Sequence, residues 1–147
     1  MRKLVLATLL AASGAAAQEL PPGIEVDTIA LAPGDAVVIG FEQGFDHQLL
    51  RVRHRGGEAL VAPLAPGEVR AHFIVSGGES MLEIENATGQ TLYFDALADR
   101  RGSGGFSPVP VASVPAGGAT VAGRWAFPIA TLTLGEFSYG PHGDHEH

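Results

Sequence analysis

Residues 69–97 decide the fold class, and they read VRAHFIVSGGESMLEIENATGQTLYFDAL. Within residues 69–76 every second side chain is apolar, and this period of two is that of a β-strand with one buried face. Gly77 and Gly78 then permit a tight turn, and residues 81–85 resume the alternation. The stretch therefore predicts antiparallel β-structure.

A second turn follows in the same stretch at residues 86–90, which read Asn-Ala-Thr-Gly-Gln. It separates residues 81–85 from the apolar strand at residues 91–97, and we expect these two strands to pair as a hairpin. Residues 86–88 also match the sequon for N-glycosylation, but a turn explains them without any modification.

The rest of the chain repeats this organisation. Its 20 Gly and 10 Pro residues interrupt short apolar-polar alternations, and after residue 17 no long segment has the helical period of about 3.6 residues. The segment 106–115 is expected at a sheet edge, because its prolines remove donors from the ladder. About eight to nine short strands are expected, at residues 24–29, 36–41, 47–54, 59–62, 69–76, 81–85, 91–97, 106–115 and 124–139. This pattern predicts an all-β fold, an antiparallel β-sandwich of immunoglobulin-like or jelly-roll type.

The N-terminal segment predicts export. Residues 1–17 combine basic residues at Arg2 and Lys3 with an apolar run and with small residues at Ala15 and Ala17. These are the features of a cleaved secretory signal peptide, with cleavage after Ala17.

Cleavage would leave one β-sandwich domain at residues 18–139 and a tail rich in His and acids at residues 140–147. The mature chain would keep seven Arg, no Lys and sixteen acidic residues, and so a net charge of −9. A composition rich in Ala, Gly, Pro and Arg indicates a bacterial source, and we therefore expect a periplasmic or secreted protein.

Charge and cysteine content exclude several classes of function. The whole chain has a formal net charge of −7, which gives no electrostatic basis for binding nucleic acid. The absence of Cys excludes disulfides, lipid attachment through Cys and a thiolate copper site. After the signal peptide no apolar run reaches the length of about 18 residues that a membrane span needs.

No grouping of residues predicts catalysis. The nucleophile motif Gly-x-Ser-x-Gly does not occur on a strand-to-helix turn. Glu83 and Glu85 share one face of a strand, where solvated carboxylates are expected and not the desolvated acid of a catalytic pair. The sequence thus predicts a protein that is not an enzyme, with a secreted hydrolase as a remote alternative.

The C-terminal residues form the densest group of potential metal ligands. His142, His145 and His147 supply imidazole nitrogens, and Asp144 and Glu146 supply carboxylates. These ligands suit Cu(II), Zn(II) and Ni(II), and a tail without regular structure can wrap them around one ion. We expect the tail to chelate a divalent transition metal (Cu, Zn or Ni), with a merely solvated tail as the alternative.

Two other imidazoles, His54 and His72, fall on strands that could approach each other, with Asp46 or Glu58 as a further ligand. Only the strand parity brings them together, and we expect polar surface residues there instead of a joint site.

Residues 51–55 form a basic stripe, Arg-Val-Arg-His-Arg, in an acidic protein. Alternation predicts that Arg51, Arg53 and Arg55 share the face opposite the apolar side chains. We expect acidic residues of neighbouring strands to balance them.

These observations predict an exported, non-catalytic accessory protein that binds a partner or a metal ion. A protein partner is expected at the edge strand 106–115 or at the loop 99–105. The alternative is a dedicated periplasmic carrier or sensor of Cu, Zn or Ni, in which the tail histidines join a ligand from the folded domain.

Overall fold

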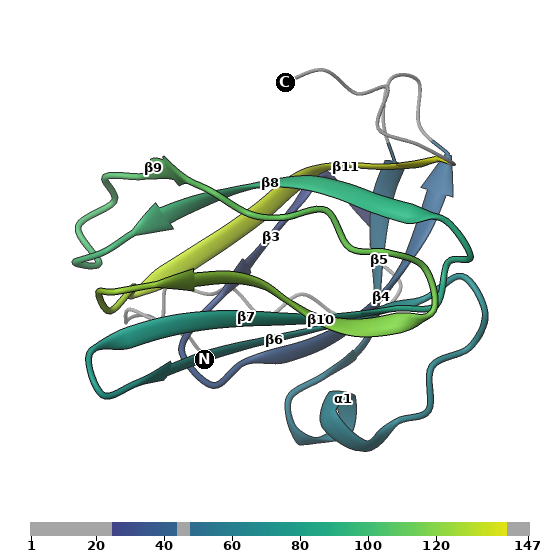
Figure 1. Cartoon of the computed structure of the whole chain (residues 1–147), viewed down its shortest axis with the longest axis horizontal. Helices are drawn as coiled ribbons and strands as arrows, with labels where there is room; N and C mark the ends of the chain where they lie inside the picture. The colour runs from purple at the N-terminus through teal and green to yellow at the C-terminus, as the bar shows by residue number, and fades with distance from the viewer. Residues whose placement is uncertain (1–24, 44–47, 141–147) are drawn as a thin grey trace, which may run out of the picture.

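The computed structural model describes residues 25–43 and 48–140, which form two antiparallel sheets in a sandwich-like arrangement (Figure 1). The all-β prediction is thereby confirmed. The predicted signal peptide and the tail that is predicted to bind metal lie outside the described residues.

The six-stranded sheet has the order β10-β7-β6-β4-β5-β2. Its strands are β2 (Glu25–Val26), β4 (Ala36–Gln43), β5 (Gln48–Arg55), β6 (Val69–Ser76), β7 (Glu79–Asn86) and β10 (Gly118–Trp125). The four-stranded sheet has the order β3-β11-β8-β9. Its strands are β3 (Thr28–Leu31), β8 (Thr91–Asp99), β9 (Ser107–Val109) and β11 (Thr131–Gly140).

The core lies between the two sheets and follows the predicted alternation. In β7, for example, Leu82 and Ile84 are buried, while Glu83 is exposed. Phe137 of β11 stacks on Phe94 of β8, with ring centroids 5.5 Å apart and an interplanar angle of 14°. Each fully buried large side chain of this kind contributes about 1.5–3 kcal/mol through the removal of apolar surface from water.

The hairpin predicted between residues 81–85 and 91–97 is wrong. Strand β7 pairs with β6 and β10, whereas β8 pairs with β11 and β9, so residues 87–90 carry the chain from one sheet to the other. The hairpin partner of β7 is β6, across the Gly77-Gly78 turn.

The side chain of Asn86 explains this change of sheet. Its Nδ2 lies within hydrogen-bonding distance of the carbonyl oxygens of Gln90 (2.8 Å), Val114 (3.0 Å) and Pro115 (3.3 Å). Its Oδ1 accepts a hydrogen bond from the amide of Thr88 (2.9 Å), and the residue is buried. One amide group thus joins the turn to a segment almost thirty residues away. Because its nitrogen is already hydrogen-bonded, the contact favours a role in the turn over glycosylation of Asn86.

The long strand expected at residues 124–139 is divided in the structure. Strand β10 belongs to the six-stranded sheet, β11 belongs to the four-stranded sheet, and residues 126–130 connect them. The sequence pattern does not indicate the start of β10, because its residues are mostly small and a bulge interrupts its register between Val121 and Gly123. A β-carbon at Gly123 would lie 2.3 Å from the ring of Trp125, so only glycine fits beneath this indole.

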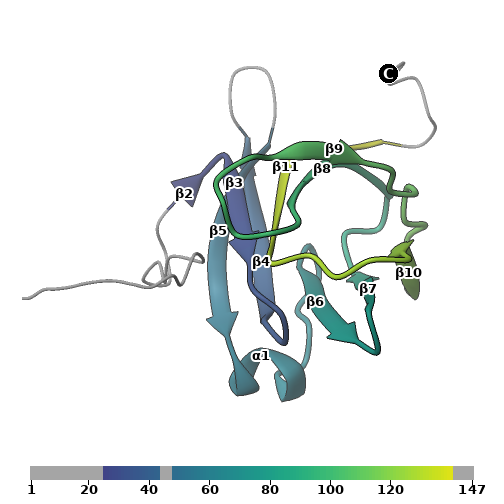
Figure 2. The same cartoon turned by 90° about the vertical axis from the view of Figure 1, so that its left-hand side faces the viewer.

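The strand expected at residues 59–62 is also wrong, because residues 57–61 form the short helix α1 (Gly57–Val61). The helix lies against the outer face of the six-stranded sheet, on the side away from β8 and β9 (Figure 2). There Ala59 and Leu64 cover Ala36 and Val38 in a second, smaller apolar cluster. Within residues 25–43 and 48–140 no helix is long and apolar enough to cross a membrane.

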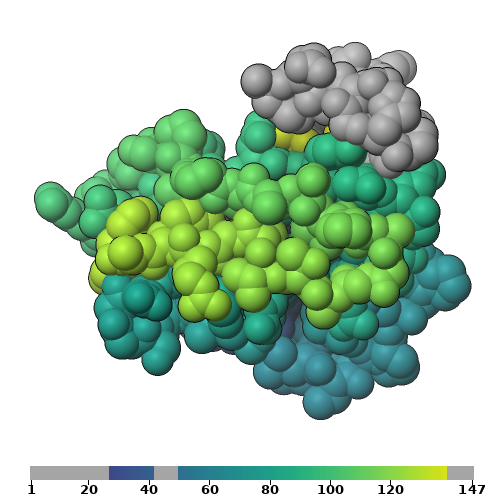
Figure 3. All heavy atoms as spheres, in the orientation of Figure 1, coloured from purple at the N-terminus to yellow at the C-terminus, as the bar shows by residue number. Residues whose placement is uncertain are grey.

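The Pro-rich segment 106–115 lies at a sheet edge, as predicted. Strand β9 pairs with β8, and further along the segment Val114 forms an isolated bridge with Leu92 of the same strand. The amide of Ala112 donates to the carbonyl of Ala122 (2.8 Å), and the indole Nε1 of Trp125 donates to the carbonyl of Pro110 (3.2 Å). Figure 3 shows this part of the chain in green, on the surface that faces the viewer.

We expect Asn86→Ala to lower the free energy of unfolding by about 2–4 kcal/mol, because it removes the hydrogen bonds that the buried Asn86 amide makes to the turn and to residues 114–115. Urea denaturation of the variant measures this loss. The control is Gln90→Ala at an exposed position of the same turn, which should change stability by less than about 0.5 kcal/mol. Equal midpoints for the two variants would show that the Asn86 side chain does not hold the connection between the sheets.

Candidate functional site

The outer face of the six-stranded sheet carries two rows of residues that run across neighbouring strands. Each row contains both polar and apolar side chains. One row crosses five strands and contains Ala119, Glu85, Arg70, Val38 and His54. The next row contains Val121, Glu83, His72 and Ala36. Because directly opposed residues of an antiparallel pair share a face, the acids of β7 lie beside the bases of β6.

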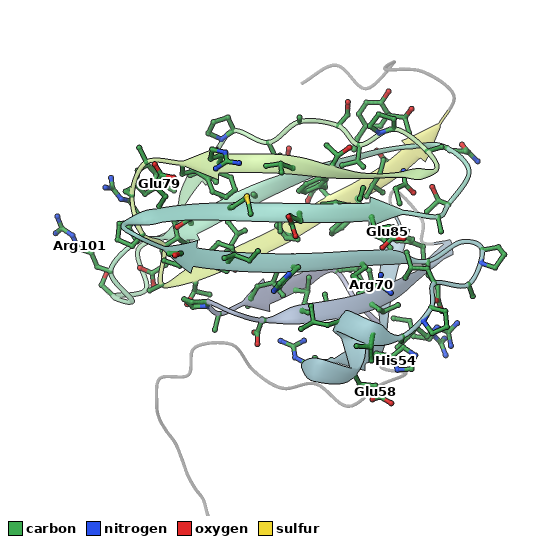
Figure 4. The ribbon with its side chains drawn as sticks, turned by 60° about the horizontal axis from the view of Figure 1, so that its bottom comes forward. His54, Glu58, Arg70, Glu79, Glu85 and Arg101 are labelled. Atoms are coloured by element: carbon green, nitrogen blue, oxygen red, sulfur yellow. The ribbon has the colours of Figure 1, made fainter. Side chains whose placement is uncertain are left out.

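Arg70 joins the helix to this face (Figure 4). Its Nη1 donates to Glu85 Oε1 at 2.6 Å, and its Nε donates to the carbonyl of Ala59 at 2.8 Å. Its Nη2 donates to the carbonyl of Ala62. The guanidinium therefore binds one carboxylate and two carbonyl groups around the end of α1, which fixes the position of the helix on the sheet.

The two histidines form separate pairs. Nδ1 of His72 lies 3.7 Å from Glu83 Oε1, and Nδ1 of His54 lies 3.7 Å from Glu58 Oε1. The strands that carry them are separated by β4, so the structure does not bring His54 and His72 together. Asp46, the other ligand considered for a joint site, lies outside the described residues, among which no group of three or more His, Asp or Glu could hold a metal ion.

A groove with a volume of about 320 Å³ lies over these rows. Its charged floor and its two apolar walls are formed by Arg70, His72, Glu83, Glu85, Leu60 and Val121. The wall residues are largely solvent-exposed, Leu60 of α1 at 45% and Val121 of β10 at 41%. The groove therefore combines exposed apolar surface with charges that already pair with each other.

Neither wall of the groove was predicted from the sequence. The sequence pattern places Leu60 in a predicted strand at residues 59–62 and Val121 outside every predicted strand. The signal for α1 was the run Glu-Ala-Leu at residues 58–60, which consists of good helix formers but is too short to show a period.

The basic stripe at residues 51–55 does not lie on one face. The register of β5 against β4 shifts between the pairs His54–Val38 and Val52–Ile39, which makes Arg53 the extra residue of a β-bulge. The bulge reverses the alternation beyond it, so the prediction that all three arginines share a face is wrong.

The acidic partners predicted for the stripe are present for two of its arginines. Arg53 Nε lies 3.8 Å from Glu68 Oε2. Arg55 opposes the core residue Val37, and its Nη2 lies 3.6 Å from Asp35 Oδ2. The same Nη2 donates to the carbonyl of Ala30 in the other sheet (3.2 Å).

The loop at residues 99–105 is organised around Asp99. Its carboxylate accepts hydrogen bonds from the backbone amides of Gly102 (2.9 Å), Ser103 (3.1 Å) and Gly104 (2.8 Å). These bonds favour the charged form and hold the pKa of Asp99 below its ordinary value, with the amide of Gly104 as the largest cause. The carboxylate therefore fixes the loop that was expected to contact a partner.

The predicted metal ligands His142, Asp144, His145, Glu146 and His147 all lie outside the described residues.

Comparisons of the chain with models of protein families, with curated proteins and with solved structures found no match.

We expect Asp99→Asn to lower the melting temperature at neutral pH, because the amide group cannot accept all three hydrogen bonds. A pKa that is lower in the folded than in the unfolded chain stabilises the fold above about pH 3.9, the unfolded value, and this stabilisation is lost as the pH falls through the folded value. The difference in melting temperature between wild type and variant should therefore be largest above about pH 5 and shrink towards about pH 2.

Calorimetry over this pH range tests the expectation. The matched control, Asp95→Asn, removes a carboxylate with an exposed side chain from the same strand and should leave the melting temperature at pH 7 unchanged. A difference for Asp99→Asn that stays constant from neutral to acid pH would contradict the assignment to the carboxylate charge.

Proposed function

We propose that the protein is an exported, non-catalytic binding protein of a bacterial periplasm or secretome. In this proposal a partner segment lies in the groove between Leu60 and Val121, and the C-terminal tail chelates Cu, Zn or Ni. The scaffold would be a sandwich of the immunoglobulin-like or jelly-roll type, which presents its outer sheet face and end loops to partners.

The groove is the observation that carries this proposal. Its charged groups are paired before any partner arrives, as with Arg70 and Glu85, so a partner need not supply a counter-charge to them. Affinity would come from apolar side chains placed between Leu60 and Val121, where about 25 cal/mol is gained for each Å² removed from water. The exposed carboxylate of Glu83 would add a polar contact at the floor.

The surroundings of the acids support binding over hydrolysis. A carboxylate that acts as a general acid needs a desolvated position. The side chains of Glu83 and Glu85 are 48% and 46% exposed, and each faces a base on β6. This arrangement favours a structural role for both acids.

Strand addition at residues 106–115 receives less support than the groove. Pro108 and Pro110 have no N–H to donate, and the amide of Ala112 already bonds to Ala122. The loop at residues 99–105 remains a second proposed contact surface, because Arg100 and Arg101 are exposed there.

The groove can be tested with peptides selected from a displayed random library on the mature protein. We expect them to bind Leu60→Asp/Val121→Asp at least about tenfold more weakly, since burial of two apolar side chains is lost. The matched control is Val61→Asp, because Val61 is 79% exposed but does not line the groove. Peptides that bind all three proteins equally would contradict the proposed site.

The tail can be tested by calorimetric titration of Cu(II), Zn(II) and Ni(II). The protein should be purified from a periplasmic fraction. Its mass then also tests the predicted cleavage, because it should equal that of a chain beginning at Gln18. We expect binding to the mature chain and its loss on truncation after Pro141, because three imidazoles are removed. Binding tighter than about micromolar that survives the truncation would require a ligand set in the folded domain and would favour the carrier or sensor instead.

A further inference from the structure

Six of the seven arginines of the folded domain fall into two groups. Arg53, Arg55 and Arg70 each lie within ion-pair distance of a carboxylate. Arg100, Arg101 and Arg124 form no ion pair with any acid in the part of the chain that the structure describes, and all three are exposed.

The unpaired arginines lie around one end of the sandwich, on both sides of the connection at residues 126–130. Arg100 and Arg101 follow the end of β8, and Arg124 is the penultimate residue of β10. The guanidinium carbon of Arg100 is 3.7 Å from the centroid of the Phe127 ring, so the connection itself holds one of the three cations.

The backbone of this end is fixed by several hydrogen bonds. The Asp99 carboxylate holds the amides of residues 102–104, and the Asp99 carbonyl accepts from the amide of Ala130 at 2.9 Å. Ser80 Oγ donates to the carbonyl of Phe127 at 2.8 Å, which ties the connection to β7. A fixed backbone lowers the entropic cost of presenting the arginines to a ligand.

The acids at this end do not neutralise the arginines. Asp99 is buried, and backbone amides bind its carboxylate. Glu79 lies at the same end as Arg101 (Figure 4), but it forms no ion pair among the described residues. Three guanidinium groups without an ion pair among the described residues therefore lie at one end of the sandwich, on a chain whose net charge is −7.

We infer that this end of the sandwich binds an acidic segment of a partner protein. Guanidinium groups bind carboxylates through two parallel hydrogen bonds, which favours discrete carboxylates as ligands. Phe106 lies in the adjacent segment and is 43% exposed. It provides an apolar surface for a side chain of the partner. The inference rests on the proposed function, since it names the chemistry of a partner for the same binding protein.

An anionic membrane fits these observations less well. Recognition of a lipid surface uses clusters of about four to eight basic residues, whereas this end has three.

The probe is a fluorescent peptide of six glutamates with a central phenylalanine, titrated into the mature protein and followed by anisotropy. We expect Arg100→Gln/Arg101→Gln/Arg124→Gln to weaken its binding at least about tenfold, because three charge-assisted contacts are lost. An increase in salt from about 50 to about 300 mM should weaken binding to the wild type by a similar factor. The matched control, Arg53→Gln, removes a half-exposed arginine that already pairs with Glu68 and should bind like the wild type.

Equal binding by the wild type and the triple variant would overturn the inference. So would binding to phosphatidylglycerol vesicles, dependent on the same arginines, without binding to the peptide. Loss of peptide binding in Leu60→Asp/Val121→Asp but not in the arginine variant would overturn the inference and leave the groove intact. Because the altered side chains are exposed, unchanged melting temperatures should accompany all of these measurements.

Discussion

The amide group of Asn86 is the contact on which the arrangement of the two sheets depends. It lies where the chain leaves β7, and it binds carbonyl groups of the local turn and of residues 114–115. A buried amide without these partners would cost about 1–3 kcal/mol, so the two segments stabilise each other only when both are in place. Residue 86 is also paired with Gly118 at the start of β10, so this contact lies where β7, the turn and the approach to β10 meet.

The outer face of the six-stranded sheet is made asymmetric by one further contact. Arg70 binds the carbonyl groups of Ala59 and Ala62 and thereby holds α1 over one half of the face. The other half stays open, and the groove lies between the helix and β10. At one end of the same sandwich, Asp99 fixes the loop that carries Arg100 and Arg101. Both candidate contact surfaces are thus shaped by a charged side chain bound to backbone groups.

Local pattern located most of the strands but did not identify their partners. The alternation in residues 69–76 and 81–85 correctly located β6 and β7, because one face of each is buried and the period of two records burial directly. It could not show that β7 and β8 belong to different sheets. The turn between them is held by a hydrogen bond from Asn86 to the carbonyl of Val114, which is distant in the sequence. The pattern also did not predict the bulge at Arg53 or the helix α1. A single extra residue or one helical turn is too short to leave a periodic signal. The groove was therefore beyond prediction, whereas the tail ligands remain a prediction that rests on residue type alone.

The Pro-rich segment has a consequence for the behaviour of the chain at high concentration. Sheets with open edges pair with one another, and a chain without cysteine has no disulfides that could hold its edges apart. Here the edge strand β9 has three residues, one of them Pro108, and the segment that follows it bonds to β10 at Ala122. Two of the sheet edges therefore offer few backbone groups to a second copy, and the same prolines that interrupt the ladder protect the protein against edge-to-edge aggregation.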